Sequence, residues 1–501
     1  MGTIRKQSIV SSIIIYTGFV IGALNTWFFA SHYFTPEQYG LTRVLLDITQ
    51  TLFVLANIGA VPVMYRFYPY YRDWLPMQRR DLFGKTTLIS LAGFVCVSIA
   101  LFAFKDLYIR KFMGNSPMLV RYFYAIYPFT FFLLIFSLLE AQAWNHFSSL
   151  AANFFKELGQ RLFTTFLIIL FILHWLNFDQ FITVYSLLYG VSAVCLLIYL
   201  VRKNQISFTI KTSVITRRLY KKMLPFGLFV FLVSLCTMVS RTFDGIIISS
   251  LLGLSYAGIF TFASYITSLL EAPQRGLIAA SVPVIAQAWK DKDLGRISRI
   301  YQKSSINMLL FSGFLFGLIW LNLHNAVIIF RINPEFMRAE TVLLLLGLSK
   351  VIELGTGVNA QILGTSRYWK MDLGTNVILI ITLIPLNYLL IKKWGINGSA
   401  LATLIAFFIF NVIRFTLIWV KFKMQPFTWR TLAAIGVLLS SYAIAHYLVH
   451  IDIPLLEAVV QSILYATVSL LLIVKLQVSE DINHLAETTL QKLKGFFSRN
   501  M

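Results

Sequence analysis

The chain is 501 residues long, 58% of its residues are hydrophobic and 13% are charged, and its mean hydropathy is +0.74. These values exclude an ordinary soluble domain and indicate a membrane protein. The 43 Lys and Arg outnumber the 21 Asp and Glu, which gives a net charge of +22. In a soluble protein this excess would suggest nucleic-acid binding, whereas in a membrane protein it is typical of basic cytoplasmic loops. We therefore expect no nucleic-acid partner.

The sequence contains no pattern that indicates a disulfide, a metal site or another cofactor. Its three cysteines, Cys96, Cys195 and Cys236, lie in apolar runs without ligand-like spacing. It has no P-loop, which argues against ATP-driven transport within the chain. At the N-terminus Arg5 and Lys6 precede an apolar run that lacks a small-residue cleavage site, so we expect a retained first span rather than a signal peptide.

About fourteen apolar runs are long enough to cross a bilayer. They predict an all-α polytopic membrane protein with about fourteen transmembrane helices. The runs are 8–31, 41–66, 82–104, 120–144, 156–176, 180–201, 222–250, 256–288, 303–322, 340–363, 370–391, 396–420, 429–449 and 454–475.

Basic residues gather in alternate connections between these runs, which predicts that both termini are cytoplasmic. The most basic connection is 202–221, before the seventh run. The cluster at 105–121 fits this orientation poorly. The connections assigned to the outer side hold Lys105, Arg110, Lys111, Arg121, Arg331, Arg338, Lys392 and Lys393.

The basic connection also looks like the midpoint of an internal repeat. At an offset of 218 residues, 39–49 aligns with 257–267, with three identities that include Gly40 and Gly258. Six spans in each half would give both halves the same orientation. The predicted organisation is an N-terminal six-helix lobe (1–201), a basic cytoplasmic linker (202–221), a C-terminal six-helix lobe (222–421), two extra transmembrane helices (422–476) and an amphipathic cytoplasmic tail (477–501).

The second span combines a strong helix start with charge at membrane depth. Thr35 can cap the helix, Pro36 suits its first position, and Gln38 completes a capping box. Arg43 and Asp47 then lie four residues apart inside the apolar run. Further on, Gly59 and Pro62 interrupt the run, and charges together with helix breakers at this depth point to function.

Four of the charges inside predicted spans are cations with an opposite charge three or four residues away. One interpretation is that each pair neutralises itself so that its helix can insert. The other is that a hydrophilic cavity faces the pairs and an anionic substrate competes for the cations. On that interpretation the substrate-binding candidates are Arg43, Arg241, Arg275 and Lys350, and the ion-coupling candidates are Asp47, Asp244, Glu271 and Glu353.

Among these candidates Glu271 stands out, because it lies near the centre of its span beside Pro273 and Gly276. Such interruptions allow bending, although a static kink would give the same pattern. We expect Glu271 to be the coupling group, since a carboxylate that loses its Arg partner to a phosphate gains affinity for a proton. Arg414 lies about two turns from a span end and is expected to snorkel to the interface.

Several stretches resemble the polysaccharide-exporter, or O-antigen unit flippase, branch of the multidrug/oligosaccharidyl-lipid/polysaccharide (MOP) flippase superfamily. They are the turn FTPEQYG at 34–40, the IGA…YR pattern at 58–66, RTFDGIIISSLLGLSYAGIF at 241–260 and NVILIITLIPLNYLLIKKWGINGSALAT at 376–403. The resemblance implies a MATE-like fold, with two six-helix lobes around a central cavity plus two C-terminal helices. It also implies that the second, seventh and eighth spans line that cavity.

The resemblance further implies a transporter in the bacterial inner membrane that moves lipid-linked (polyprenyl diphosphate) oligosaccharide outward for surface polysaccharide and lipopolysaccharide biosynthesis. Implied partners are this substrate, membrane lipids, a polysaccharide polymerase and glycosyltransferases. A lipid II flippase is an alternative, because that substrate also carries pyrophosphate. A drug antiporter of the same fold is a second alternative, which Arg43, Arg241 and Arg275 argue against. We do not expect an enzyme, because the first outer loop offers only Glu37 as an acidic residue.

Overall fold

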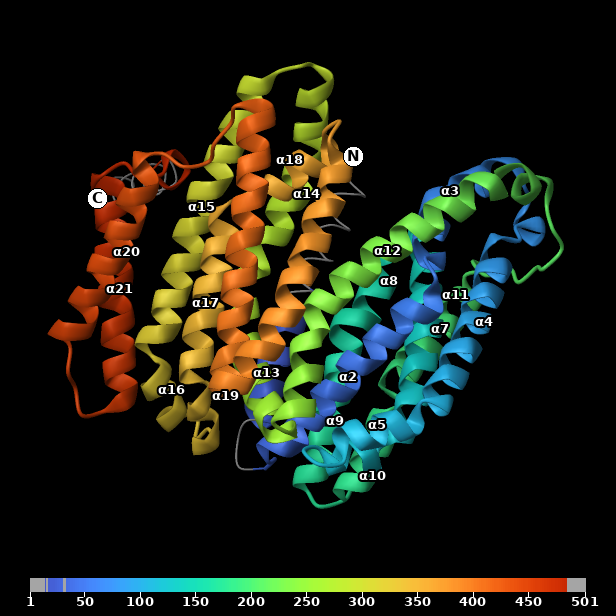
Figure 1. The fold of residues 1–501 in the computed structure, drawn as a ribbon, viewed down its shortest axis with the longest axis horizontal. Helices are drawn as coiled ribbons and strands as arrows, with labels where there is room; N and C mark the ends of the chain where they lie inside the picture. The colour runs from blue at the N-terminus through green and yellow to red at the C-terminus, as the bar shows by residue number, and fades with distance from the viewer. Residues whose placement is uncertain (1–13, 15–16, 30–32, 484–501) are drawn as a thin grey trace, which may run out of the picture. The chain divides into compact units, whose positions relative to one another are not determined.

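Helices make up all the regular secondary structure of the residues that the computed structural model describes, which are 14, 17–29 and 33–483. The side chains of 275, 279 and 280 are likewise not described. The fold separates into two units, Met1–Thr261 and Phe262–Met501, and each is considered by itself (Figure 1).

The first unit begins with the apolar helix Thr17–Phe29. Its further helices are α2 (Pro36–Asn57), α3 (Ala60–Trp74), η1 (Met77–Arg79), α4 (Leu82–Ala103), α5 (Lys105–Phe112), α6 (Pro117–Arg121), η2 (Phe123–Ala125), α7 (Ile126–Asn145), α8 (Ser149–Asn153), the π-helical η3 (Phe154–Gly159), α9 (Gln160–Ile172), α10 (Phe178–Tyr185), α11 (Leu188–Arg202) and α12 (Val214–Leu251). The first turns of α13 (Leu254–Ser268) complete it.

The second unit continues through α13 to a broken span and then to long helices. Its elements are η4 (Leu269–Glu271), α14 (Ala272–Lys290), α15 (Leu294–Leu321), α16 (Leu323–Ile329), η5 (Pro334–Ala339), α17 (Glu340–Gly355), α18 (Asn359–Thr365), α19 (Trp369–Phe422), α20 (Trp429–Leu448) and α21 (Pro454–Lys475). Non-helical backbone at Trp394 and Gly395 divides α19 into two helices at the turn expected from the sequence.

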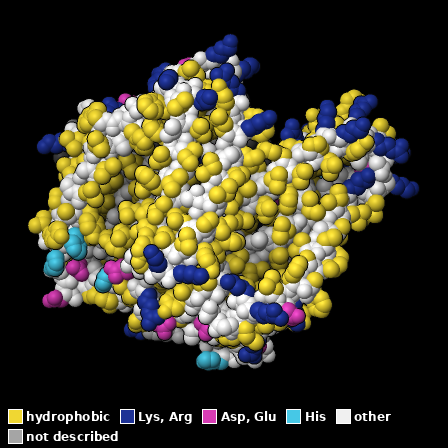
Figure 2. Space-filling model, in the orientation of Figure 1, with side chains coloured by type: hydrophobic (Ala, Val, Ile, Leu, Met, Phe, Trp, Pro, Cys, Tyr) yellow, Lys and Arg dark blue, Asp and Glu magenta, His cyan; other side chains and the backbone are white. Residues whose placement is uncertain are grey.

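The predicted all-α polytopic membrane fold is confirmed. Within the described part of the chain, eight helices are long and apolar enough to cross a membrane, and two bent helix pairs each pass the same test as a broken span. Each of the fourteen predicted runs coincides with a helix or with consecutive helices. Hydrophobic side chains cover the lengths of the helices, and Lys and Arg gather at helix ends (Figure 2).

The start of α2 is the predicted capping box. The Thr35 hydroxyl accepts a hydrogen bond from the Gln38 backbone at 3.2 Å, and the Gln38 side chain accepts one from the Thr35 backbone at 3.1 Å. At the other end, Ile58 and Gly59 adopt left-handed backbone with φ of 47° and 74°, which bends α2 from α3 by 46°. A Cβ on Gly59 would lie 2.3 Å from the carbonyl oxygen of Gly227 in α12, so this break also lets two backbones approach.

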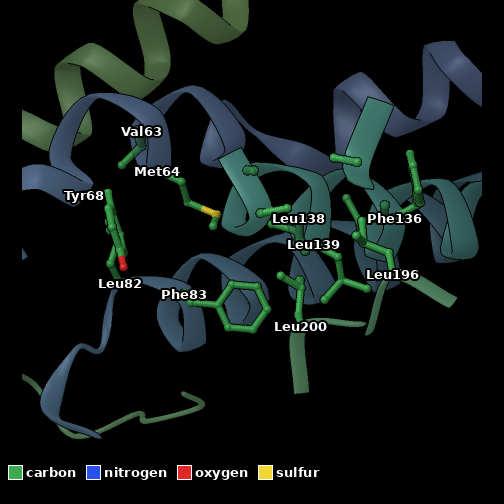
Figure 3. Packing of buried hydrophobic residues seen from close by; sticks show 14 of the residues in the cluster. Val63, Met64, Tyr68, Leu82, Phe83, Phe136, Leu138, Leu139, Leu196 and Leu200 are labelled. Carbon is green, nitrogen blue, oxygen red and sulfur yellow. The ribbon is translucent and has the colours of Figure 1, made fainter. Parts of the chain in front are cut away.

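A packed apolar core holds one end of the first unit together. Leucines and aromatic side chains from α3, α4, α7 and α11 meet there (Figure 3). Those labelled in the figure are Val63, Met64, Tyr68, Leu82, Phe83, Phe136, Leu138, Leu139, Leu196 and Leu200.

The helices keep the offset of 218 residues seen in the sequence. The first residue of α2, Pro36, corresponds to Leu254 at the start of α13, and the last residue of α4 corresponds to the last residue of α15. A Cβ on Gly40 would lie 1.9 Å from the Leu254 carbonyl oxygen, and one on Gly258 would lie 2.1 Å from the Pro36 carbonyl oxygen. These two contacts are reciprocal, as a two-fold relation between α2 and α13 requires.

The contacts divide the chain later than the basic connection at 202–221. The helix α12 packs along α2, so it lies in the first unit although its sequence opens the second half. The lobe boundaries 1–201 and 222–421 therefore remain a prediction about the internal repeat. Of the predicted tail at 477–501, the structure describes residues up to 483, and 480–483 are helical.

Candidate functional site

The first charged cluster lies between α2 and α12. Asp47 is subject to attraction by Arg43 one turn before it and to repulsion by Asp244 of α12. Gly245 makes room for it, since a Cβ there would lie 2.5 Å from the Asp47 carboxylate oxygen Oδ2. One turn further along, the hydroxyls of Thr51 and Thr242 are 3.1 Å apart and tie the two helices together. We call Arg43, Asp47 and Asp244 the first cluster.

Tyrosines surround the guanidinium of Arg43. Its central carbon lies 5.2 Å from the ring centroid of Tyr39, a buried residue one turn earlier in α2. Arg43 also lies close enough to Tyr185 and Tyr189 to act on both electrostatically. These residues come from α10 and α11, so three helices converge on one arginine.

This arrangement can bind an oxyanion that carries hydroxyl-rich groups. A guanidinium presents five N–H donors in a planar fork that matches phosphate oxygens, and phenol hydroxyls donate and accept hydrogen bonds. The two carboxylates outnumber the arginine, so an incoming anion would require one of them to be neutralised or displaced. The first cluster therefore has the groups needed to couple anion binding to proton uptake.

The second charged cluster lies at the broken span of the second unit. The Lys350 ammonium is 2.5 Å from Oε1 of Glu271 and 2.9 Å from Oε2 of Glu353. Its Nζ also lies 5.2 Å from the ring centroid of Phe407 in α19. Glu271 ends the short turn η4, just before Pro273 in the first turn of α14. We call Glu271, Lys350 and Glu353 the second cluster.

A further ion pair adjoins the second cluster and corrects the prediction for Arg414. This side chain does not snorkel, since the residue is only 7% exposed and its guanidinium lies 2.5 Å from Asp372. Its Nε donates to the Thr375 hydroxyl at 3.2 Å, and the Phe410 ring centroid is 4.0 Å away. Partners on the other half of α19 thus hold the arginine inside the bundle.

The bend between α17 and α18 carries buried polar groups. The two helices differ in direction by 48°, and Gly357 in the connection has a φ of 64°. The Thr356 hydroxyl donates to the Asn411 amide oxygen at 3.1 Å, and the Asn359 amide donates to both Thr356 and Asn411. This network fixes the end of α17 one turn beyond Glu353.

The structure brings together six of the eight predicted site residues, in two groups of three. Arg43, Asp47 and Asp244 meet from α2 and α12, and Lys350 and Glu353 pair within α17. Arg241 is exposed. The side chain of Arg275 lies outside the described residues, and the partner that the structure gives Glu271 is Lys350, on another helix.

Sequence reasoning missed other ionic contacts. Asp372 was not a candidate, because its partner Arg414 lies in a different helix and spacing carries no sign of it. Glu140, buried in α7, accepts from Lys156 at 2.9 Å. Glu157 and Arg161 form an ion pair of 2.8 Å beside the π-helical turn η3. A π-helical turn is a frequent companion of functional sites.

Two families match parts of the chain. The family described as polysaccharide biosynthesis protein matches residues 4–289, more than half of the sequence. The MatE family matches residues 228–389. No curated protein matches the chain.

Solved transporters share the fold. The lipid II flippase MurJ in an inward closed conformation has a TM-score of 0.70 at 15% identity, with 93% of this chain and 99% of that chain covered. An inward-facing multidrug resistance MATE transporter of the MOP superfamily has a TM-score of 0.62 at 14% identity, with 82% and 98% covered. The MATE multidrug transporter DinF-BH has a TM-score of 0.53 at 18% identity, with 83% and 95% covered.

The first cluster lies within the residues that match the polysaccharide biosynthesis family, and the second lies within those that match MatE, apart from the unmatched Arg414 beside it. The helices around both clusters are those of a multi-pass membrane protein whose structural relatives are flippases and transporters. The chain therefore belongs to the polysaccharide biosynthesis protein family, within the MOP superfamily of flippases.

Proposed function

We propose that this protein flips a polyprenyl diphosphate-linked oligosaccharide from the cytoplasmic to the outer leaflet of the bacterial inner membrane by alternating access, for surface polysaccharide biosynthesis. The observation that carries the proposal is the first cluster: an arginine ringed by tyrosines inside an apolar bundle, in the part of the chain that matches the polysaccharide biosynthesis family. Arg43 binds the diphosphate, and the tyrosine hydroxyls face its polar surroundings.

Arg241, Arg275 and Lys350 stay as further substrate-binding candidates, with unequal support. Lys350 already directs hydrogen bonds to two carboxylates, which leaves one of its three donors. A phosphate would have to displace one of these carboxylates before it could pair with Lys350. We therefore rank Lys350 below Arg43 as a substrate contact.

The second cluster supports a role in energy coupling. Two carboxylates share one ammonium, so the group of three carries one negative charge and a single proton neutralises it. If Lys350 swings fully to Glu353, Glu271 loses its counter-charge and takes up the proton. Asp47 and Asp244 form the corresponding carboxylate pair beside Arg43. Proton movement down its gradient would then drive flipping without an ATP site.

Lipid II is the second candidate substrate, because the MurJ fold superposes on 93% of this chain. The two substrates share the polyprenyl diphosphate and differ in the sugar and peptide. Arg43 alone cannot tell them apart, so the family match decides the order in which we place them. A drug antiporter ranks third, since a cationic drug would be repelled by Arg43.

A flipping assay in proteoliposomes tests the proposal. The purified protein is given a polyprenyl diphosphate oligosaccharide, lipid II or a cationic dye, and the fraction reaching the far leaflet is measured by an impermeant quencher or enzyme. We expect transport of the oligosaccharide lipid. Transport of lipid II or the dye alone would overturn the assignment. In cells, depletion should accumulate the lipid-linked oligosaccharide on the cytoplasmic side.

The membrane orientation is a separate part of the proposal. Reporter fusions at Lys211 and Lys292 should report the cytoplasm, and fusions at Ser255 and Pro334 should report the outer side. Both termini would then be cytoplasmic, where glycosyltransferases deliver the substrate, and a polymerase would consume the product outside. A reversed result at Lys211 would contradict the orientation.

A further inference from the structure

A polar cavity in the second unit is separate from both charged clusters. It has a volume of about 290 Å³ and forms where α15 and α20 begin and the chain emerges from α21. Its charged lining comprises Arg299 and Lys303 of α15, Arg430 of α20, and Glu480 and Asp481 beyond α21. We call these five residues the tail pocket.

The two carboxylates of the tail pocket act as counter-ions to its cations. Lys303 Nζ lies 3.2 Å from Glu480 and 3.5 Å from Asp481, and Arg430 Nη1 lies 3.0 Å from Glu480. The hydrogen bond from Arg430, with Lys303 beside it, lowers the pKa of Glu480, so this carboxylate is ionised at neutral pH. Arg299 is exposed and makes no ion pair with any residue in the described part of the chain. Three cations thus face two carboxylates.

The corresponding joint in the first unit contains its own acid. Asp81, fully buried at the start of α4, accepts hydrogen bonds from the Ser213 backbone at 2.9 Å and the Thr216 hydroxyl at 2.8 Å. Lys85 lies 3.6 Å from Asp81 and donates to Thr212 at 2.7 Å. This joint ties α4 to the start of α12 and leaves no basic cavity among the described residues.

At the offset of 218 residues the two joints match position by position, but their chemistry differs. The carboxylate of the first joint is replaced by an arginine in the second, and a threonine is replaced by another arginine. The matched positions are Asp81 with Arg299, Lys85 with Lys303, and Thr212 with Arg430. The second joint has therefore lost its built-in acid and gained two cations, and the carboxylates that line its pocket come from the C-terminal segment.

These carboxylates are held weakly, whereas the backbone that carries them is anchored. The side chains of Lys303 and Glu480 are 50% and 60% exposed, and exposed ion pairs exchange readily. Val478 is fully buried, and Ile482 packs on the apolar cluster formed by α15, α20 and α21. The carboxylates can swing out while the walls of the pocket stay in place.

The tail pocket lies at the depth of lipid headgroups. Trp429, which also lines it, begins α20 and is 66% exposed, as is typical of an aromatic side chain at a membrane interface. Lys303 lies where the apolar run of α15 begins. Clustered Lys and Arg at this depth attract anionic headgroups, and an arginine fork matches phosphate oxygens.

We propose that the tail pocket binds the phosphate of an anionic membrane phospholipid, and that Glu480 and Asp481 are displaceable counter-ions that compete with it. The C-terminal segment thereby sets how strongly the second unit holds an anionic lipid. The proposal is independent of the transported substrate.

Native mass spectrometry of the full chain in detergent tests this proposal. The protein is titrated with phosphatidylglycerol or phosphatidylcholine, and bound lipids are counted. Glu480→Gln with Asp481→Asn should tighten phosphatidylglycerol binding at least about threefold, because weak competing pairs are removed. Arg299→Gln should weaken it by a similar factor, and this change breaks no ion pair with a described residue, so it spares the fold. Phosphatidylcholine binding should not change in either variant.

A matched control separates the pocket from net charge. Arg202→Gln with Lys203→Gln removes two exposed cations at the end of α11 and should leave phosphatidylglycerol binding unchanged. Equal binding by the wild type and Arg299→Gln would overturn the proposal. Competition by inorganic phosphate at the same concentration as the lipid would overturn the assignment to a lipid rather than a free phosphate.

Discussion

The two charged clusters use similar residue types in different ways. In the first, Arg43 is surrounded by tyrosines from three helices and adjoins two aspartates. In the second, the Lys350 ammonium is held within 3 Å of two glutamates, and the neighbouring Arg414 is buried against Asp372. A cation held by carboxylates is costly to expose to a new anion, whereas an arginine among phenols keeps a binding surface. The difference teaches that charge at membrane depth must be read with its partners.

The largest expected effect comes from breaking the first cluster. Arg43→Ala should lower flipping of the diphosphate-linked substrate roughly 10- to 100-fold, because it removes hydrogen bonds from a charged donor. Arg43→Lys should recover only part of the activity, since Lys lacks the planar fork. The assay is initial flipping rate in proteoliposomes at matched protein content.

Arg338→Ala is the control for this prediction, because Arg338 is an exposed arginine in the turn η5. It should flip at the wild-type rate. Wild-type flipping by Arg43→Ala would show that the first cluster is structural, which is the other interpretation of its charges.

Breaking the second cluster should remove the response to a pH gradient rather than flipping itself. Glu271→Gln should abolish the acceleration by an imposed gradient and leave substrate binding measurable. Glu353→Gln is the matched variant, because it removes the same charge from the same lysine, and it should retain a response. An unchanged response in Glu271→Gln would contradict its assignment as the coupling group.

A comparison of the two arginines sharpens the contrast between clusters. Arg414→Ala leaves Asp372 buried without its partner and should lower the free energy of unfolding by about 3 kcal/mol. Arg414→Gln with Asp372→Asn should cost less than the two single changes added together. Thermal unfolding in detergent measures this. An equally large loss for Arg43→Ala would erase the distinction between a structural and a functional arginine.

The smallest expected effect separates pH-dependent stability from pH-dependent coupling. Burial lowers the pKa of His146 from 6.5, and its Nε2 accepts from the Tyr68 hydroxyl at 2.7 Å while Nδ1 contacts the Gln142 carbonyl. The neutral ring stabilises the first unit above pH 6.5, and this contribution is lost as pH falls through the lowered pKa. His146→Gln should flatten the modest decline in melting temperature between about pH 7.5 and about pH 5.5. An unchanged decline would exclude His146 as its source.

Local features of the molecule could be predicted from sequence, and long-range pairs could not. The capping box of α2, its break near Gly59 and the Lys350–Glu353 pair all depend on residues within a few positions of each other. Glu271–Lys350 and Arg414–Asp372 join different helices, and the intrahelical spacing that suggested Arg275 as the partner of Glu271 carries no information on tertiary contacts. The snorkelling expected of Arg414 failed for the same reason, because Asp372 holds it inside.

The central claim is that Arg43 binds the diphosphate of a lipid-linked oligosaccharide during flipping. The most direct measurement is the affinity of the purified protein for a polyprenyl diphosphate oligosaccharide and for its monophosphate counterpart, in the wild type and in Arg43→Ala. We predict that the wild type prefers the diphosphate and that Arg43→Ala loses this preference while keeping the fold. An undiminished preference for the diphosphate in Arg43→Ala would contradict the claim.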